Sequence, residues 1–247
     1  MESYGIFADF YDALTLNVDY KERARYIVDT LKSLNHDMGL TLDLACGTGK
    51  LTLELKKLGV DVYGADASED MLSVAYEKAV EEGFGDMLFL CQKMQELDLY
   101  GSIDTCVCTL DSINHMTDIA DVKMTFERVS LFMNKGGYFL FDVNTVYKHR
   151  EVLGDNTFVY DLDEVYCVWE NSLKENNVVD IDINFFVPNG ELYERYEESF
   201  SERAYTENEL TDMLKGAGFE VVKRFGDMTD KAPSDDEQRV IYIAKKK

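Results

Sequence analysis

The chain alternates short apolar runs with amphipathic helical patterns through residues 1–145. Apolar residues recur at helical spacing between the runs, and glycines close several of these helical segments. Strands that are separated by helical crossovers lie parallel in one sheet, with helices on its faces. We therefore expect an α/β protein built on a Rossmann-like, doubly wound and mostly parallel sheet. The expected strands are residues 40–44, 60–65, 87–91, 103–110 and 138–143.

A different period interrupts this pattern at residues 151–203. Apolar and polar side chains alternate there, and Asn189-Gly190 is a hairpin signal between two such runs. This predicts an inserted annex of about three antiparallel strands. The helical rhythm then returns, and residues 1–150 and 204–247 are expected to form one domain around the annex. Two closing strands, residues 219–225 and 240–244, complete its sheet, and the final strand is expected to be antiparallel.

The charge balance makes some classes of binding partner unlikely. The 247 residues include 25 Lys and Arg against 48 Asp and Glu, which gives a formal net charge of -23. Phosphate backbones and anionic lipid surfaces are repelled by such a chain, so nucleic acid and membranes are unlikely partners. No apolar run reaches the roughly 18 residues of a membrane helix, and the first residues lack the basic flank of a signal peptide. We expect a cytoplasmic protein.

Cysteine and histidine are too sparse for several kinds of site. The five cysteines include no C-x-x-C pair, so neither a disulfide framework nor a zinc ribbon fits. With three histidines, metal clusters and Ser-His-Asp arrangements have few residues to draw on. We therefore expect no metal and no nucleophilic triad. The histidines are His36, His115 and His149.

The segment LDLACGTGK, residues 42–50, is a strand that enters a glycine-rich turn and opens a helix. Gly47 and Gly49 allow a sharp turn and a close approach of the backbone to a ligand, and the free N–H groups of the helix start face that ligand. The third glycine of the dinucleotide fingerprint is replaced by Thr52. The loop therefore predicts a bound ligand, and Thr52 argues against a nicotinamide-dependent oxidoreductase.

Asp66 ends the second expected strand, where a carboxylate can accept hydrogen bonds from both hydroxyls of an adenosine ribose. The same negative charge disfavours a ribose 2′-phosphate. Together with the glycine loop, Asp66 predicts an adenosine-containing ligand.

The segments LDLACGTGKLTLEL and VYGADASEDMLSVA resemble the S-adenosylmethionine-binding half of the class I methyltransferases, and their small-molecule N- and O-methyltransferases in particular. The resemblance covers residues 4–145 by motif and residues 204–244 more loosely. It implies an enzyme with S-adenosylmethionine as cofactor, which moves a methyl group to nitrogen or oxygen of a small metabolite by in-line displacement. In this reading the annex covers the acceptor side.

The resemblance also implies individual cofactor contacts. Asp43 would lie near the methionine amino group, with Tyr11 over the methionine end, and Asp66 would hold the ribose. Ala45 stands where the family often has glycine, a replacement that is tolerable if the local φ is negative. Lys93 replaces an acid that often binds adenine, and lysine carries no acceptor. The remaining implied contacts are Ala45, Gly47, Gly49, Ala67, Met71, Met94 and Leu110.

The segment after the fourth expected strand is placed at the acceptor by the rule that ligands bind beyond the carboxyl ends of parallel strands. We expect Asp111 and Asn114 to bind the small-molecule acceptor and His115 to be catalytic, since an imidazole can accept a proton near neutral pH. His115 could instead only orient its loop. An RNA or protein methyltransferase and a non-catalytic S-adenosylmethionine-binding module remain as alternatives, and the oligomeric state is not predicted.

Overall fold

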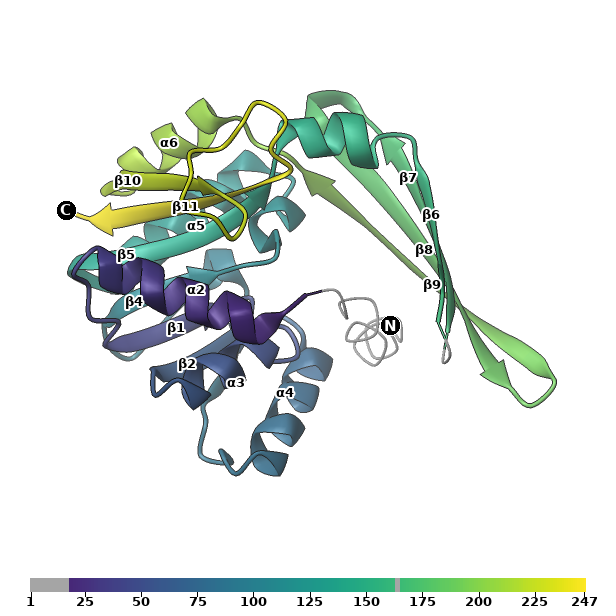
Figure 1. The fold of residues 1–247 in the computed structure, drawn as a ribbon, viewed down its shortest axis with the longest axis horizontal. Helices are drawn as coiled ribbons and strands as arrows, with labels where there is room; N and C mark the ends of the chain where they lie inside the picture. Colours follow the sequence, from purple (N-terminus) through teal and green to yellow (C-terminus); the bar gives the residue numbers. More distant parts are fainter. Residues whose placement is uncertain (1–17, 163–164) are drawn as a thin grey trace.

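The computed structural model describes residues 18–162 and 165–247, so Tyr11 lies outside the described residues. A seven-stranded sheet forms the body of the molecule, with strand order β10-β11-β5-β4-β1-β2-β3 (Figure 1). β11 runs antiparallel to both of its neighbours, and the other pairs are parallel. The expected doubly wound sheet with an antiparallel final strand is therefore confirmed. The strands are β1 (Leu40–Leu44), β2 (Asp61–Asp66), β3 (Phe89–Cys91), β4 (Ile103–Cys108), β5 (Met133–Asn144), β10 (Phe219–Gly226) and β11 (Arg239–Lys246).

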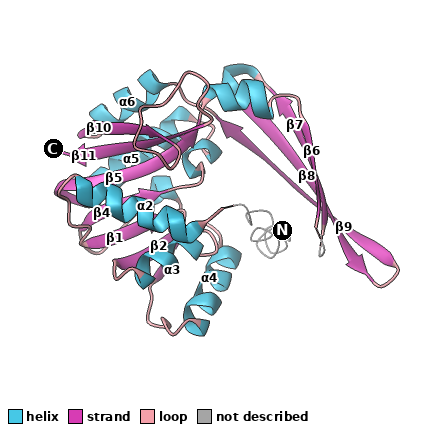
Figure 2. Ribbon diagram, in the orientation of Figure 1, coloured by secondary structure: helices cyan, strands magenta, loops and turns pink. Residues whose placement is uncertain are grey.

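Helices cover both faces of this sheet, as Figure 2 shows by colour. Alternate side chains of β5 enter opposite cores: Phe139 and Phe141 pack with α5 and α6, whereas Tyr138 and Leu140 pack with α2 and α3. A strand that is buried on both faces reads as a continuous apolar run, which is why β5 was visible in the sequence. The helices are α2 (Tyr20–Ser33), α3 (Lys50–Lys57), α4 (Glu69–Glu81), α5 (Ile119–Phe132) and α6 (Glu207–Gly216).

β5 begins earlier than expected. It starts at Met133, which pairs with Ile103, whereas the sequence suggested a helix up to the two glycines. Gly136 has φ +85, and a Cβ on Gly137 would lie 2.6 Å from the carbonyl oxygen of Asp104. The two glycines therefore allow a tight passage inside the strand rather than ending a helix.

A separate four-stranded antiparallel sheet, β6-β7-β8-β9, forms the annex and projects away from the main sheet (Figure 1). The short helical segment η3 (Lys148–Leu153) leads into it from β5. β8 and β9 form the expected hairpin, and Gly190 takes φ +63 in its turn. The annex has one strand more than expected, because the mostly exposed β6 lacks a clear alternation. Its strands are β6 (Thr157–Asp161), β7 (Tyr166–Leu173), β8 (Val178–Asn189) and β9 (Leu192–Arg203).

Among the helices of residues 18–162 and 165–247, none has the length and apolarity needed to cross a membrane.

Candidate active site

The turn between β1 and α3 carries three residues in the left-handed region: Ala45 at φ 58, Gly47 at φ 52 and Gly49 at φ 74. The condition for an unstrained alanine at this position, a negative φ, is therefore not met at Ala45. An alanine in this conformation costs roughly 1–2 kcal/mol. The strained backbone therefore lies at the turn that the glycine pattern predicted to bind a ligand. Backbone strain of this kind is often found at functional sites.

The two glycines have different surroundings. A Cβ on Gly47 would meet nothing within 4 Å, and Gly47 lines a cavity. A Cβ on Gly49 would lie 2.8 Å from the Cβ of Ala75, on α4, and Gly49 does not line that cavity. Gly47 thus leaves room for a ligand, whereas Gly49 lets α3 start close to α4.

Asp66 lies at the carboxyl end of β2 and faces the same cavity. Its two carboxylate oxygens accept the backbone N–H groups of Gly47 at 2.8 Å and of Ser68 at 2.9 Å. Each oxygen keeps lone pairs for further donors, because an ionised carboxylate offers about four acceptor positions. The residues present therefore fit the two hydroxyls of an adenosine ribose.

Asp43 lies beside this loop on β1, with its side chain buried. The hydroxyl of Thr52 donates a hydrogen bond of 2.6 Å to its carboxylate. Burial, reinforced by the negative charge of Asp66, raises the pKa of Asp43 to about 7 despite this bond. A ligand ammonium group would stabilise the ionised form, so Asp43 fits the implied role near a methionine amino group.

A cavity of about 530 Å³ lies between the main sheet and the annex. Such a volume falls within the roughly 300–1,000 Å³ of small-molecule sites. The sequence-predicted residues that line it are Ala45, Gly47, Asp66, Met71, Met94, Leu110, Asp111 and His115. The annex contributes Phe158, Tyr160, Trp169, Ile183, Phe200 and Glu202.

Other sequence-predicted residues lie elsewhere. Asp43 lines a smaller neighbouring pocket together with Ala45 and Leu110. Ala67 is exposed and, like Gly49, is absent from the lining of the large cavity. The contact roles given to Ala67 and Gly49 stay predictions without support from this lining.

Asn114 has a different place from the one expected. Its side chain is fully buried and does not line the cavity. The amide donates to the carbonyl oxygens of Asn144 and Arg203 and accepts the N–H of Asn144. Asn114 therefore ties the segment after β4 to β5 and β9, and its amide is occupied by backbone groups rather than directed at an acceptor.

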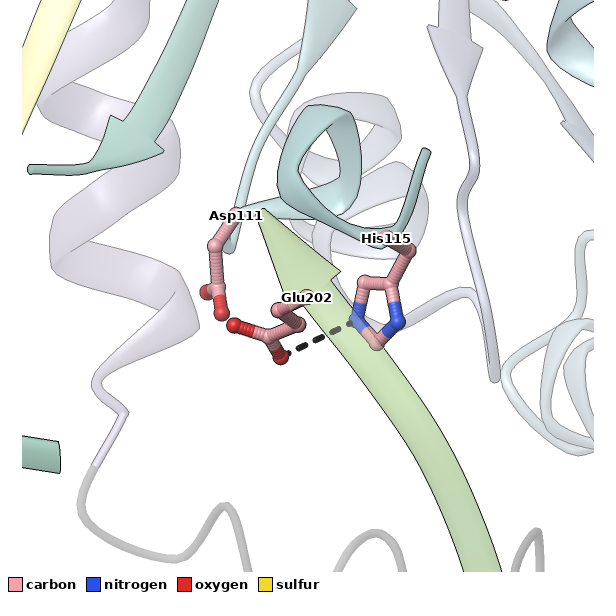
Figure 3. A group of neighbouring side chains, drawn as sticks. All are labelled: Asp111, His115 and Glu202. Atoms are coloured by element: carbon pink, nitrogen blue, oxygen red, sulfur yellow. Dashed lines mark ion pairs between the residues drawn. The ribbon is translucent and has the colours of Figure 1, made fainter. Parts of the chain in front are cut away.

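Charged side chains from four elements form one wall of the cavity. Three of them, Asp111, His115 and Glu202, are drawn in Figure 3. His115 Nε2 lies 3.6 Å from Glu202 Oε1, and Asp111 Oδ1 accepts a 2.6 Å hydrogen bond from Arg239. Lys148 also lines the cavity and donates to Asn144 Oδ1 at 2.9 Å.

The two acids of this wall differ in their protonation. Burial, together with the charge of Asp111, raises the pKa of Glu202 to about 7, although His115 and Lys148 act in the opposite direction. Burial also opposes ionisation of Asp111, but the adjoining Arg239 and Lys148 charges outweigh it and lower the pKa of Asp111. Asp111 is thus a fixed anion, and Glu202 is poised to gain or lose a proton near neutral pH.

Glu202, Lys148 and Arg239 were missed by the sequence reasoning. Glu202 shares one face of β9 with Tyr196 and Phe200, which pack on the annex core. Glu198 is buried on the same face, so the alternation along β9 did not by itself single out Glu202.

Asp111, His115 and Glu202 also present ligand atoms within 4.8 Å of one another, close enough for a metal ion. Both oxygens of Asp111 already accept hydrogen bonds, from Arg239 and from Asn144. Arg239 and Lys148 lower the pKa of Asp111 through their positive charges, so its carboxylate is already compensated by these two side chains. We therefore assign no metal to this group, and the expected absence of a metal stays a prediction.

Asp142 fixes the backbone beneath this wall. Its carboxylate accepts the N–H groups of Leu110 at 2.9 Å and of Asp111 at 2.7 Å, and Arg239 donates to it at 2.7 Å. Leu110 and Asp111 have φ values of 57 and 56, which are unfavourable for residues other than glycine. The buried carboxylate therefore holds a strained turn that directs Asp111 towards the cavity.

Comparison with known proteins identifies the family to which the chain belongs. Residues 41–137 match the model of a methyltransferase domain. Over 245 residues the chain is 35% identical to "Putative methyltransferase YqeM" of Bacillus subtilis (strain 168), with 98% of this chain and 97% of that protein covered. An S-adenosylmethionine-dependent methyltransferase from Clostridium acetobutylicum ATCC 824, known from a crystal structure, is 36% identical over 98% of both chains, with a TM-score of 0.90. The sugar N-methyltransferase KedS8 from Streptoalloteichus sp ATCC 53650 shares the fold at a TM-score of 0.79, with 17% identity over 96% of this chain and 92% of its own.

The fold, the loop and these similarities define the class: an enzyme that uses S-adenosylmethionine as its cofactor. The chain belongs to the class I S-adenosylmethionine-dependent methyltransferases. The resemblance that the loop and Asp66 suggested is confirmed.

Proposed function

We propose that this enzyme transfers a methyl group to the amine nitrogen of a small metabolite that enters the cavity as a cation. The observation that carries the proposal is the buried Glu202 carboxyl at the acceptor end of the cavity, beside His115. A carboxylate stabilises an ammonium group by a charge-assisted hydrogen bond. The similarity in fold to a sugar N-methyltransferase supports nitrogen as the acceptor atom.

The annex side of the cavity supports a cationic acceptor as well. Phe158, Tyr160, Trp169 and Phe200 line it, and aromatic faces attract cations. The net charge of -23 also draws small cations towards the protein at long range. The same charge disfavours RNA as the methyl acceptor.

Methyl transfer requires mainly that the acceptor nitrogen, the methyl group and the sulfur lie in line. S-adenosylmethionine supplies an activated methyl group on a positively charged sulfur. Asp66 and the Gly47 turn would hold the adenosyl part, and Asp43 the methionine amino group. Asp111, His115 and Glu202 would orient the acceptor, while the aromatic annex residues exclude water. Holding two reactants in line contributes about 7–11 kcal/mol of barrier lowering.

A methyl-transfer screen with matched acceptors tests the proposal. Radiolabelled S-adenosylmethionine is offered with glucosamine, putrescine or tyramine, and in parallel with the hydroxyl counterparts glucose, butane-1,4-diol and tyrosol. Bulk tRNA and a denatured protein mixture serve as macromolecular acceptors. We expect label in at least one amine and none in its hydroxyl partner. Label in only a hydroxyl compound, RNA or protein would contradict the proposal, as would no transfer to any acceptor.

A further inference from the structure

Glu202 lies between two histidines. Its Oε1 is 3.6 Å from Nε2 of His115, and its Oε2 is 3.7 Å from Nε2 of His149. The other ionisable groups that face it are Asp111 and Lys148, while the Asn144 amide donates to Oε2 at 3.4 Å. Glu202 is therefore the centre of a small set of groups that can share a proton.

The hydrogen bonding of His149 bears on where that proton resides. His149 is fully buried, and its Nδ1 lies 3.0 Å from the carbonyl oxygen of Asn177, which can only accept. Nδ1 therefore carries the hydrogen, and in the neutral ring Nε2 carries a lone pair. Among the described residues, Nε2 has no hydrogen-bond partner. Burial lowers the pKa of His149 and so favours this neutral ring.

A lone pair of His149 that faces an ionised Glu202 gives no stabilisation to the carboxylate. The negative charge of Asp111 on the opposite side also disfavours ionisation. Both neighbours thus favour a proton on Glu202, whereas His115 and Lys148 favour its release. The balance suits a group that accepts a proton and gives it up again.

The solvent exposure of the Glu202 and His115 side chains indicates the route by which the proton leaves. The Glu202 side chain is 5% exposed, whereas that of His115 is 48% exposed. His115 is thus the member of the pair in contact with solvent. A proton that reaches Glu202 inside the cavity can leave through the His115 imidazole.

We propose that Glu202, supplied by the annex, accepts the proton that the acceptor amine loses, and that His115 passes this proton to solvent. The inference rests on the proposed methyl transfer to an amine. It assigns the annex a chemical role in addition to its role as a cover of the cavity.

The Glu202 carboxylate takes one proton from R–NH3⁺, breaking an N–H bond and forming an O–H bond, which leaves R–NH2 with a free lone pair. The lone pair forms the N–CH3 bond while the S–CH3 bond breaks, and its electron pair stays on sulfur. The products are R–NH2⁺–CH3, neutral S-adenosylhomocysteine and protonated Glu202. The proton then moves to His115 Nε2 and on to water.

The test compares Glu202→Gln with Glu197→Gln. Glu197 lies on the same strand, but its side chain is 63% exposed and pairs with Arg195, so it controls for loss of one carboxylate from β9. Both variants are assayed with the amine that the screen identifies, and S-adenosylhomocysteine affinity is measured for each. We expect Glu202→Gln to lower kcat by about 100-fold or more, the usual contribution of a positioned base, with cofactor affinity within about twofold. Glu197→Gln should match the wild type.

The pH profile separates a proton acceptor from a structural residue. In the wild type, kcat should rise with pH through an inflection near 7, and this inflection should be absent from Glu202→Gln. A Glu202→Gln variant that keeps the wild-type kcat and inflection overturns this inference alone, because methyl transfer to an amine would still stand. A wild-type enzyme that methylates no amine overturns both the inference and the proposed function.

Discussion

His115 Nε2 and Glu202 Oε1 lie 3.6 Å apart, although His115 follows β4 of the main sheet and Glu202 belongs to β9 of the annex. The contact brings a half-exposed imidazole and a buried carboxyl group together on the charged wall of the cavity. The annex therefore completes the charged wall of the site instead of only covering it. Changes on either sheet are expected to affect methyl transfer.

Removal of the Asp66 carboxylate should weaken cofactor binding. Asp66→Ala is expected to cost about 1.5 kcal/mol or more of S-adenosylmethionine affinity, because hydrogen bonds to a charged group are each worth about 1.5–3 kcal/mol. Isothermal titration calorimetry measures the change, and circular dichroism checks that the variant is folded. Asp61→Ala, at the exposed start of the same strand, is the control. Unchanged affinity in a folded Asp66→Ala protein would remove the ribose assignment.

The two loop glycines should respond differently to alanine. Gly49→Ala brings a Cβ to 2.8 Å from Ala75 at φ +74, so it should destabilise the protein by more than the roughly 1–2 kcal/mol of the backbone conformation alone. Gly47→Ala has open space around the new Cβ, so its loss of stability should come mainly from the unfavourable backbone conformation. It should nevertheless bind the cofactor more weakly than the wild type. Urea unfolding and calorimetry on both variants separate the two effects. Equal losses of stability, or full affinity in Gly47→Ala, would contradict this distinction.

The sequence predicted those parts of the site that are local in the chain. The β1 turn and Asp66 were identified because their roles follow from residues within two βα units. Glu202 was not, since β9 also carries Glu194, Glu197 and Glu198, and only the register with β8 and the path of β9 bring one of them to His115.

Arg239 was also missed, because its place in the site depends on how distant strands pair. It reaches the site because β11 enters antiparallel beside β5, which pairs Arg239 with Asn144 at the carboxyl end of the sheet. The direction of β11 was expected, but its register was not readable from the sequence. Similarly, the apolar alternation located the annex, while the weakly patterned β6 escaped it.

Cofactor affinity should depend on pH through Asp43. Burial raises the pKa of Asp43 to about 7, so the free protein holds this group largely protonated below that pH. Because a ligand ammonium binds the ionised form of Asp43, S-adenosylhomocysteine affinity should rise with pH, by about 25-fold from about pH 5.5 to about pH 7.5. Asp43→Asn should flatten this dependence. The same steep pH dependence in Asp43→Asn would show that another group is responsible.

The raised pKa of Asp43 also makes the stability of the folded protein depend on pH. A carboxyl that holds its proton more tightly when folded stabilises the protein most at low pH, and the contribution is lost as pH rises through about 7. Glu202 acts in the same direction. The free energy of unfolding of the cofactor-free protein should therefore fall between about pH 4 and pH 7 by less in the double variant Asp43→Asn/Glu202→Gln than in the wild type. Parallel pH dependence in the two proteins, followed by urea unfolding, would contradict the assigned shifts.

Asp142 should be important for stability as well as for the site. Asp142→Asn removes a buried charge that pairs with Arg239 and with Arg23, so we expect a loss of about 3 kcal/mol in the free energy of unfolding. Asp227, the partly exposed second partner of Arg23, provides the control: Asp227→Asn should cost less than about 1 kcal/mol. Urea titrations of both variants measure the difference. Similar losses at the two positions would mean that the Asp142 contacts do not hold the turn at Leu110 and Asp111.

The most direct test of the account is the fate of a trideuterated methyl group from S-adenosylmethionine, followed by mass spectrometry of the acceptor amine. We expect the wild-type enzyme to place one CD3 group on the amine nitrogen. We expect His115→Asn to do so about 100-fold or more slowly, while binding S-adenosylhomocysteine normally. A CD3 group on oxygen, or labelling at the wild-type rate by His115→Asn, would contradict it.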